Sequence, residues 1–166
     1  MYLYNNKFMV LKNIRKTIKK LLEKKLTIST AESCTGGMLS SYFTSIDGSS
    51  KIFMLGFVTY SNQSKINVLK VPKNIIKKYG SVSKECCSSM VKNLKKIAKT
   101  NIAISITGIA GPSGGSKDKP VGLVYIGIIF KNKIIIKKNL FNKNTTRLNI
   151  QKKTCIAVFK IISKLI

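Results

Sequence analysis

Residues 30–37, with the sequence TAESCTGG, bring together residue types that can perform acyl-transfer chemistry. The segment follows a short β-prone run, residues 26–29, and precedes residues 38–43, whose pattern favours a helix. This order predicts a strand-to-helix junction, where unpaired backbone amides can bind an anion or a developing oxyanion. Ser33 is a candidate nucleophile in that setting, although a hydroxyl there can equally serve only as a helix cap.

The chemistry of this junction depends on which base is available. The sequence contains no histidine, so the base has to be Lys, Tyr, Glu, Asp or water. Tyr60 and Lys65 follow the apolar run 52–60 and are candidates if that end of the run lies against the junction. Their spacing alone does not bring them to Ser33. Cys34 is a rival nucleophile, because a helix N-terminus lowers the pKa of a thiol.

A second glycine-rich segment, residues 108–122, follows the strand-like run 101–107. Glycines, prolines, serines and lysines in one loop suit close approach of the backbone to a phosphate or another polar ligand. The order of residues matches neither a P-loop nor a dinucleotide-binding fingerprint. The alternative interpretation is a flexible surface loop.

The elements that must position these segments alternate along the chain. Helical patterns occupy residues 10–25, 38–44, 73–79, 86–98 and 147–166, and strand patterns occupy residues 26–29, 52–60, 101–107, 123–130 and 133–140. Residues 1–9 are expected to be a loose start. The alternation predicts an α/β fold, a three-layer α/β/α single domain with a mixed sheet.

Composition limits the classes of protein and partner. The chain of 166 residues is long enough for one domain with a proper core and too short to expect two. Lysine and arginine number 31 against five acids, so the formal net charge is +26 and an anionic partner has to be considered. The basic residues occur in every segment, whereas a nucleic-acid-binding protein usually concentrates them on one face. We therefore favour compositional drift toward lysine.

The cysteines and the N-terminal segment indicate a cytoplasmic protein. Cys34, Cys86, Cys87 and Cys155 have spacings that fit no zinc template, so no metal site is predicted. Reduced thiols in a cytosol are the expected state. Lysines interrupt residues 10–25, which therefore hold neither a signal-peptide core nor a membrane span. We expect no membrane partner.

Four blocks of the sequence resemble the CinA C-terminal domain family. They are TAESCTGG at 30–37, GFVTYSN at 56–62 with Lys65, GSVS at 80–83, and TGIAGPSGGS with KPVG within 107–122. The resemblance covers nearly the whole chain and implies one such amidase domain over residues 1–166. Free-standing family members are nicotinamide-nucleotide amidases (NMN deamidases), which convert nicotinamide mononucleotide and water to nicotinate mononucleotide and ammonia. The resemblance implies a homo-oligomeric hydrolase that needs no metal or other cofactor.

The same resemblance implies roles for particular residues. Ser33 is the expected nucleophile, and Lys65 and Tyr60 are the expected proton-transfer partners. A lysine acts as a base only when it is neutral, so burial or a neighbouring cation must lower its pKa. We expect attack of Ser33 on the amide carbonyl, loss of ammonia from an acyl-enzyme, and attack by water. Backbone amides near residues 35–37 are expected to stabilise the oxyanion.

Substrate contacts are expected from both glycine-rich segments and from the last helix. The implied substrate-binding residues are Thr35, Gly36, Gly37, Thr107, Gly108, Ala110, Gly111 and Arg147. The second segment is expected to hold the ribose phosphate or the ring, and Arg147 to clamp the phosphate. Gln151 stands where the family pattern suggests a second basic side chain. Glu32 has two open roles: it could orient the base or the nucleophile loop, or it could favour the helix N-terminus electrostatically.

A different class of function is a catalytically impaired basic binding module of the same fold, associated with nucleic acid. The joint presence of Ser33, Tyr60 and Lys65 favours the enzyme, because a module selected only for charge has little need of them. The expected partner is therefore the small-molecule substrate nicotinamide mononucleotide, and nucleic acid is the less favoured one.

Overall fold

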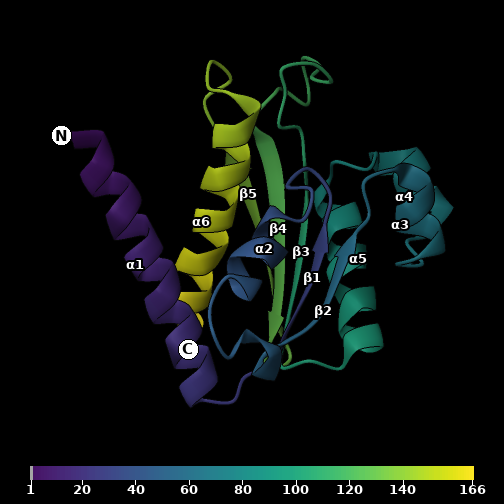
Figure 1. The fold of residues 1–166 in the computed structure, drawn as a ribbon. Helices are drawn as coiled ribbons and strands as arrows, with labels where there is room; N and C mark the ends of the chain where they lie inside the picture. The colour runs from purple at the N-terminus through teal and green to yellow at the C-terminus, as the bar shows by residue number, and fades with distance from the viewer. Residues whose placement is uncertain (1) are drawn as a thin grey trace.

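The computed structural model describes residues 2–166, with side chains from residue 12 onward. Its elements, in chain order, are α1 (Tyr2–Glu23), β1 (Ile28–Glu32), α2 (Met38–Thr44), the short 3-10 helix η1 (Ser49–Lys51), β2 (Phe53–Val58), α3 (Asn62–Asn67), α4 (Lys73–Tyr79), α5 (Lys84–Ala98), β3 (Ile102–Gly108), β4 (Leu123–Phe130), β5 (Lys133–Leu140) and α6 (Arg147–Leu165). Helices cover both faces of one sheet, which confirms the predicted three-layer α/β/α fold (Figure 1).

The first helix is longer than predicted. The sequence led us to expect a loose start over residues 1–9, but α1 already begins at Tyr2, so the expectation is wrong for residues 2–9; Met1 lies outside the described residues. Neither glycine nor proline occurs within α1, so no residue interrupts the propagation of the helix toward its N-terminal end.

The sheet has the strand order β2-β1-β3-β4-β5. β1 pairs in parallel with both β2 and β3, whereas β4 runs antiparallel to β3 and to β5, so the sheet is mixed as predicted. The carboxyl ends of β1, β2 and β3 therefore meet at one edge, and ligands of open α/β sheets bind outside such an edge. Glu32 pairs with Val58, so β1 and β2 end side by side, whereas β3 continues from Ser105, the partner of Ala31, to Gly108.

Two apolar cores hold β1 in place. On one face of the sheet, α1, α2 and α6 pack together, with the rings of Phe43 and Phe159 at a centroid separation of 4.9 Å. On the other face, α5 contributes Met90 and Leu94 to a second buried cluster. Every residue of β1 is buried as a result. The residues that follow β1 are therefore carried by a strand that is fixed on both sides.

Candidate active site

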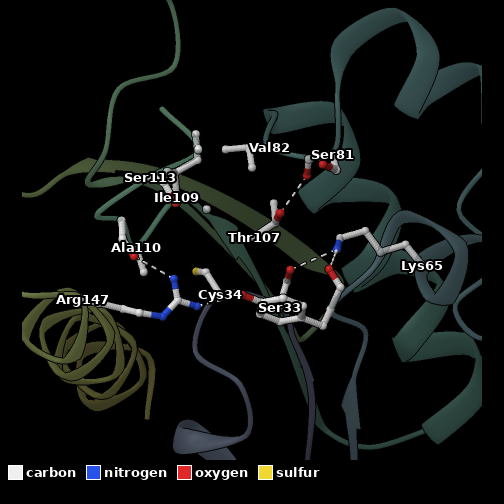
Figure 2. A pocket seen from close by; sticks show the side chains of 14 residues that line it. Ser33, Cys34, Lys65, Ser81, Val82, Thr107, Ile109, Ala110, Ser113 and Arg147 are labelled. Atoms are coloured by element: carbon white, nitrogen blue, oxygen red, sulfur yellow. Dashed lines mark hydrogen bonds between the residues drawn. The ribbon is translucent and has the colours of Figure 1, made fainter. Parts of the chain in front are cut away.

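The chain leaves β1 at Glu32 and turns through residues 33–37 into α2; we call these residues the β1–α2 turn. The amide of Gly36 donates to Ser33 O at 3.0 Å and closes the turn. Gly36 and Gly37 have φ values of 60° and 95°, in the left-handed region that glycine adopts without steric cost. The turn places Ser33 and Cys34 in the wall of a pocket at the carboxyl edge of the sheet (Figure 2).

Glu32 holds the start of α2 rather than the base. Its buried carboxylate accepts hydrogen bonds from the amides of Gly37, Leu39 and Ser40 at 2.8 to 3.1 Å and from Ser40 Oγ at 2.6 Å. A carboxylate that caps a helix N-terminus also interacts favourably with the helix dipole. Of the two roles left open by the sequence, these contacts support the capping one, which also fixes the end of the β1–α2 turn.

The amides available to an oxyanion differ from those expected. The amide of Gly36 is used by Ser33 O, and that of Gly37 by the carboxylate of Glu32. Among the described residues, no carbonyl or carboxylate oxygen accepts from the amides of Cys34 and Thr35. The expectation of an oxyanion site near residues 35–37 is therefore wrong for the two glycines, because intramolecular hydrogen bonds already occupy their N–H groups; of the three residues, only Thr35 keeps an amide that no oxygen accepts from.

Lys65 reaches this turn from α3. Its side chain is 1% exposed, and its Nζ lies 3.0 Å from Ser33 Oγ, 2.8 Å from Thr59 O and 3.2 Å from Tyr60 O. Figure 2 shows the lysine and the serine, both of which line the pocket, pointing toward each other. All three of these partners of the amino group are neutral oxygens, which stabilise an ammonium less than a carboxylate would.

Burial lowers the pKa of Lys65 below its ordinary value of 10.5. The thiols of Cys86 and Cys34 would oppose this shift only if they were ionised. Burial also raises the pKa of the Cys34 thiol to about 12 and that of the Cys86 thiol to about 11, so both thiols are neutral at neutral pH. A larger fraction of Lys65 is therefore the free amine than is the case for a lysine in solvent.

The geometry around the neutral amine directs its lone pair. A neutral lysine has two N–H bonds and one lone pair, arranged tetrahedrally. Two backbone carbonyls, Thr59 O and Tyr60 O, accept from Nζ, and Ser33 Oγ is its third neighbour. In the ammonium form Nζ donates to Ser33 Oγ as well as to the two carbonyls. In the neutral form the two N–H bonds can stay on the carbonyls, which leaves the lone pair for the proton of the Ser33 hydroxyl.

Cys34 does not have the properties expected of a nucleophile. The sequence suggested that a helix N-terminus would lower the pKa of its thiol, but burial raises that pKa to about 12, against smaller opposing effects from its own backbone amide and from Arg147 and Lys65. The residue is 5% exposed. The expectation of a rival thiolate is therefore wrong, because desolvation outweighs the nearby positive charges.

The hydroxyl of Tyr60 is joined to Arg147 rather than to Ser33. Arg147 begins α6, and its Nη1 donates to Gly111 O while its Nη2 donates to the Tyr60 hydroxyl, both at 2.8 Å. The Tyr60 side chain is 60% exposed, and only its backbone carbonyl contacts Lys65. The structure thus brings Tyr60 into the pocket but does not place its hydroxyl on the expected nucleophile.

The second glycine-rich segment forms the opposite wall. Thr107, Gly108, Ala110 and Gly111 all line the pocket, which has a volume of about 230 Å³. A Cβ on Gly108 would lie 2.7 Å from Leu123 O, so only glycine lets this wall pack against β4. Of the substrate-binding residues expected from the sequence, these four and Arg147 meet in one pocket. Thr35, Gly36 and Gly37 lie outside its lining.

Ser81 and Val82, from the segment before α5, line the pocket and were not predicted. Ile109, Ser113 and Gly114 also line it and belong to the 108–122 segment that was expected to hold the ligand, although they were not singled out within it. Thr107 Oγ1 donates to Ser81 O at 2.7 Å and ties that segment to the pocket. Ser81 and Val82 belong to the GSVS block, whose place in the motif was the one signal that could have found them.

The described chain holds neither a cluster of metal-ligating side chains nor a helix suited to span a membrane. Within residues 2–166, no group of three or more His, Cys, Asp or Glu residues is placed to hold a metal ion. None of the helices over the same residues combines the length and the apolar character that a membrane span requires.

Comparison with known proteins gives a consistent result. Residues 11–166 match the profile of the CinA C-terminal domain. A CinA-like protein of Prochlorococcus marinus is 46% identical over 149 residues, which are 87% of this chain and 34% of that protein. The chain thus spans about a third of the length of the curated relatives it matches.

Solved structures share the whole fold. The competence/damage inducible protein CihA of Agrobacterium tumefaciens superposes with a TM-score of 0.89 at 33% identity, covering 94% of each chain. The competence damage-inducible protein A of Klebsiella pneumoniae gives a TM-score of 0.88 at 26% identity, covering 93% of this chain and 95% of that one. The chain belongs to the CinA C-terminal domain family.

Proposed function

We propose that the protein is a nicotinamide-nucleotide amidase, which hydrolyses the carboxamide of nicotinamide mononucleotide to nicotinate mononucleotide and ammonia in pyridine nucleotide recycling. The observation that carries the proposal is the 3.0 Å contact between Ser33 Oγ and the buried Nζ of Lys65 in a pocket wall. A serine paired with a neutral lysine supplies both the nucleophile and the base that amide hydrolysis requires.

In the first half of the reaction, Ser33 Oγ attacks the amide carbon while its proton passes to the lone pair of Lys65. The negative charge that develops on the carbonyl oxygen is stabilised by the amide of Cys34, which lines the pocket, and by the amide of Thr35, which directly follows it in the turn. Lys65, now an ammonium, returns the proton to the leaving nitrogen, the C–N bond breaks, and ammonia departs. An ester between Ser33 and the nicotinoyl group is left.

In the second half, water attacks the ester and Lys65 again accepts a proton. The tetrahedral intermediate collapses with Ser33 Oγ as the leaving group, and Lys65 returns the proton to it. The products are the carboxylic acid, which releases its proton to water and becomes the carboxylate, and the original hydroxyl. One base serves both halves because the amine and the serine oxygen stay in contact throughout.

Arg147 supports the assignment of an anionic substrate. Its guanidinium has five N–H donors in a planar fork, and its contacts to Gly111 O and the Tyr60 hydroxyl use two of them. The remaining donors are available to phosphate oxygens at the mouth of the pocket. Cys34 lies between Ser33 and Arg147 in Figure 2, so the carboxamide and the phosphate would occupy different ends of the pocket.

The distribution of lysines supports a nucleic-acid-binding module less than the pocket supports the amidase. Exposed lysines occur on α1 and α6, on one side of the sheet, and on α4 and α5, on the other, as well as on the edge strand β5. A surface adapted to nucleic acid would concentrate its charge on one face. The even spread is what compositional drift produces, and it leaves the pocket as the feature that requires a function.

The deciding experiment measures ammonia release from nicotinamide mononucleotide by the purified, chelator-treated protein. We expect release by the wild type and by Ser163→Ala, a matched control at an exposed serine on α6. Ser33→Ala should reduce kcat by about 1,000-fold or more, because the nucleophile is removed. A wild-type rate no higher than that of Ser33→Ala would refute the proposal.

A further inference from the structure

One side chain reaches the β1–α2 turn from the far end of the sequence. Gln151 lies on α6, and its Nε2 donates to Cys34 O at 2.8 Å. Arg147 lies one helical turn earlier on the same face of α6. The helix therefore contributes to the site twice, once through a guanidinium at the mouth of the pocket and once through an amide behind the turn.

The hydrogen bond from Gln151 to Cys34 O orients a whole peptide group of the β1–α2 turn. The hydrogen bond from Gly36 N to Ser33 O makes residues 33–36 a β-turn, and the peptide between Cys34 and Thr35 is its central one. This peptide is trans, so Cys34 O and the Thr35 N–H point in opposite directions. A donor that holds the carbonyl consequently sets the direction of the Thr35 amide.

The central peptide is the part of a β-turn that can rotate. Turn types I and II differ by a flip of this plane, and the flipped form requires a positive φ at the third residue. That residue is Thr35, which does not have a positive φ here and, being β-branched, adopts one only with strain. The local sequence and Gln151 therefore favour the same orientation, and Gln151 adds a fixed partner from a separate element.

The backbone amides at the end of the turn and at the start of α2 already donate hydrogen bonds within the protein. Gly36 N is bound to Ser33 O, and the carboxylate of Glu32 holds Gly37 N and the next amides of α2. By contrast, no carbonyl or carboxylate oxygen of the described chain accepts from the amides of Cys34 and Thr35. A donor whose direction is set before the reaction stabilises a developing charge without reorganisation.

We propose that Gln151 is a positioning residue, which holds the central peptide of the β1–α2 turn so that the Thr35 amide faces the oxyanion of the acyl-transfer reaction. The inference rests on the proposed amidase function, since it assigns Gln151 a role in the same site. Gln151 does not contact the reacting atoms; it acts through Cys34 O.

The test compares four variants of the full chain. Gln151→Met keeps the side-chain length without a donor, Gln151→Glu turns an oxygen toward the carbonyl, and Gln151→Lys restores a donor. Lys153→Met, at an exposed position of the same helix, is the matched control. Each is checked for folding by its thermal midpoint and is assayed for kcat and KM with nicotinamide mononucleotide. A second assay follows the rate at which a fluorophosphonate modifies Ser33, by intact mass.

We expect Gln151→Met and Gln151→Glu to lower kcat by about 10-fold or more, less than the 100-fold to 1,000-fold caused by removing an oxyanion donor itself. KM should change less than twofold, because the substrate contacts are retained. The fluorophosphonate reaction should slow in parallel, since its phosphoryl oxygen uses the same amides, and Gln151→Lys should recover most of both rates. A purely structural role would lower the thermal midpoint without this split between kcat and KM.

Two results would overturn the inference in distinguishable ways. If the wild type releases ammonia and Gln151→Met matches Lys153→Met in kcat and in fluorophosphonate rate, the role of Gln151 is refuted and the amidase stands. If the wild type neither releases ammonia nor reacts with the fluorophosphonate at Ser33, the proposed function fails and the inference fails with it.

Discussion

Ser33 Oγ and Lys65 Nζ lie 3.0 Å apart although 32 positions separate the two residues in the sequence. Parallel pairing of β1 and β2 brings this about, because Glu32 pairs with Val58 and each chain then turns out of the sheet at the same level. The short helix α3 follows β2 and returns Lys65 toward the edge it has just left. The pair is therefore produced by strand register rather than by a local motif.

Replacing the lysine tests whether it is the base. Lys65→Met keeps much of the side-chain volume and removes the amine, so we expect kcat for ammonia release to fall by about 100-fold to 10,000-fold, the usual contribution of general base catalysis. Lys92→Met, at an exposed lysine of α5, should retain the wild-type rate. If Lys65→Met keeps more than a tenth of the wild-type kcat, another group must accept the proton of Ser33.

The lowered pKa of Lys65 predicts a pH dependence of stability that can be measured without any substrate. In the unfolded chain the lysine has its ordinary pKa of 10.5, and in the folded protein burial lowers it. Between the two pKa values the unfolded state binds more protons, so the free energy of unfolding rises with pH across that window. The increment is lost as pH falls toward the folded pKa. Denaturant titrations of the wild type should show this slope, and those of Lys65→Met should lack it.

The sequence and the structure agree on which residues lie at the carboxyl edge of the sheet, because the direction of the strands determines this. The family resemblance assigned Ser33, Lys65 and Thr107 to one site, and strand direction explains why they meet. Ser33 and Lys65 follow the parallel strands β1 and β2, and Thr107 lies near the carboxyl end of β3, at the same edge. Hydrogen-bond partners at the edge could not be predicted in this way. The carboxylate of Glu32 takes the amide of Gly37 that we expected to bind substrate, and nothing in their spacing indicates that competition.

Contacts between distant elements were the least predictable. The direction of the Tyr60 hydroxyl depends on where α6 begins, because Arg147 is its partner. The contact from Gln151 to Cys34 O joins residues that are 117 positions apart, and a glutamine on a helix gives no signal of its own. Both contacts depend on the packing of α6 against the sheet, and only its periodicity was visible in the sequence.

The raised pKa of Cys34 predicts that its thiol is unreactive in the native protein. With a pKa of about 12, almost none of the thiol is ionised at neutral pH, and the thiolate is the form that alkylates. Iodoacetamide treatment of the native protein, followed by peptide mass spectrometry, should leave Cys34 unmodified. The same treatment in denaturant should modify all four cysteines. Rapid native alkylation of Cys34 would reinstate it as a candidate nucleophile.

The contacts of Arg147 predict that it affects substrate binding more than chemistry. Arg147→Met removes a charged donor, and hydrogen bonds to charged groups contribute about 1.5 to 3 kcal/mol, so KM should rise by about 10-fold to 150-fold. Tyr60→Phe removes one neutral partner of the guanidinium and should raise KM only a few-fold, with kcat nearly unchanged. A fall in kcat of about 100-fold in Tyr60→Phe, the size expected of general acid–base catalysis, would return the hydroxyl to proton transfer.

The contacts of Glu32 predict that losing its cap of α2 lowers both stability and activity. Its buried carboxylate accepts from three amides and one hydroxyl, and Glu32→Gln would turn amide hydrogens toward some of these donors. We expect the free energy of unfolding to fall by about 1.5 to 3 kcal/mol, the range for hydrogen bonds to a charged group. Glu85→Gln, at the exposed start of α5, should change it by less than about 0.5 kcal/mol and is the matched control.

Glu32→Gln should also lower the rate of ammonia release, because the β1–α2 turn runs directly into α2. If the start of α2 shifts, Gly37 and the peptides before it move with it, and the amides of Cys34 and Thr35 no longer meet the oxyanion at the right distance. Ammonia release at a temperature where Glu32→Gln is fully folded separates this loss from unfolding. A folded Glu32→Gln with the wild-type kcat would show that the turn holds its geometry without the carboxylate, and that the bond from Gln151 to Cys34 O is sufficient.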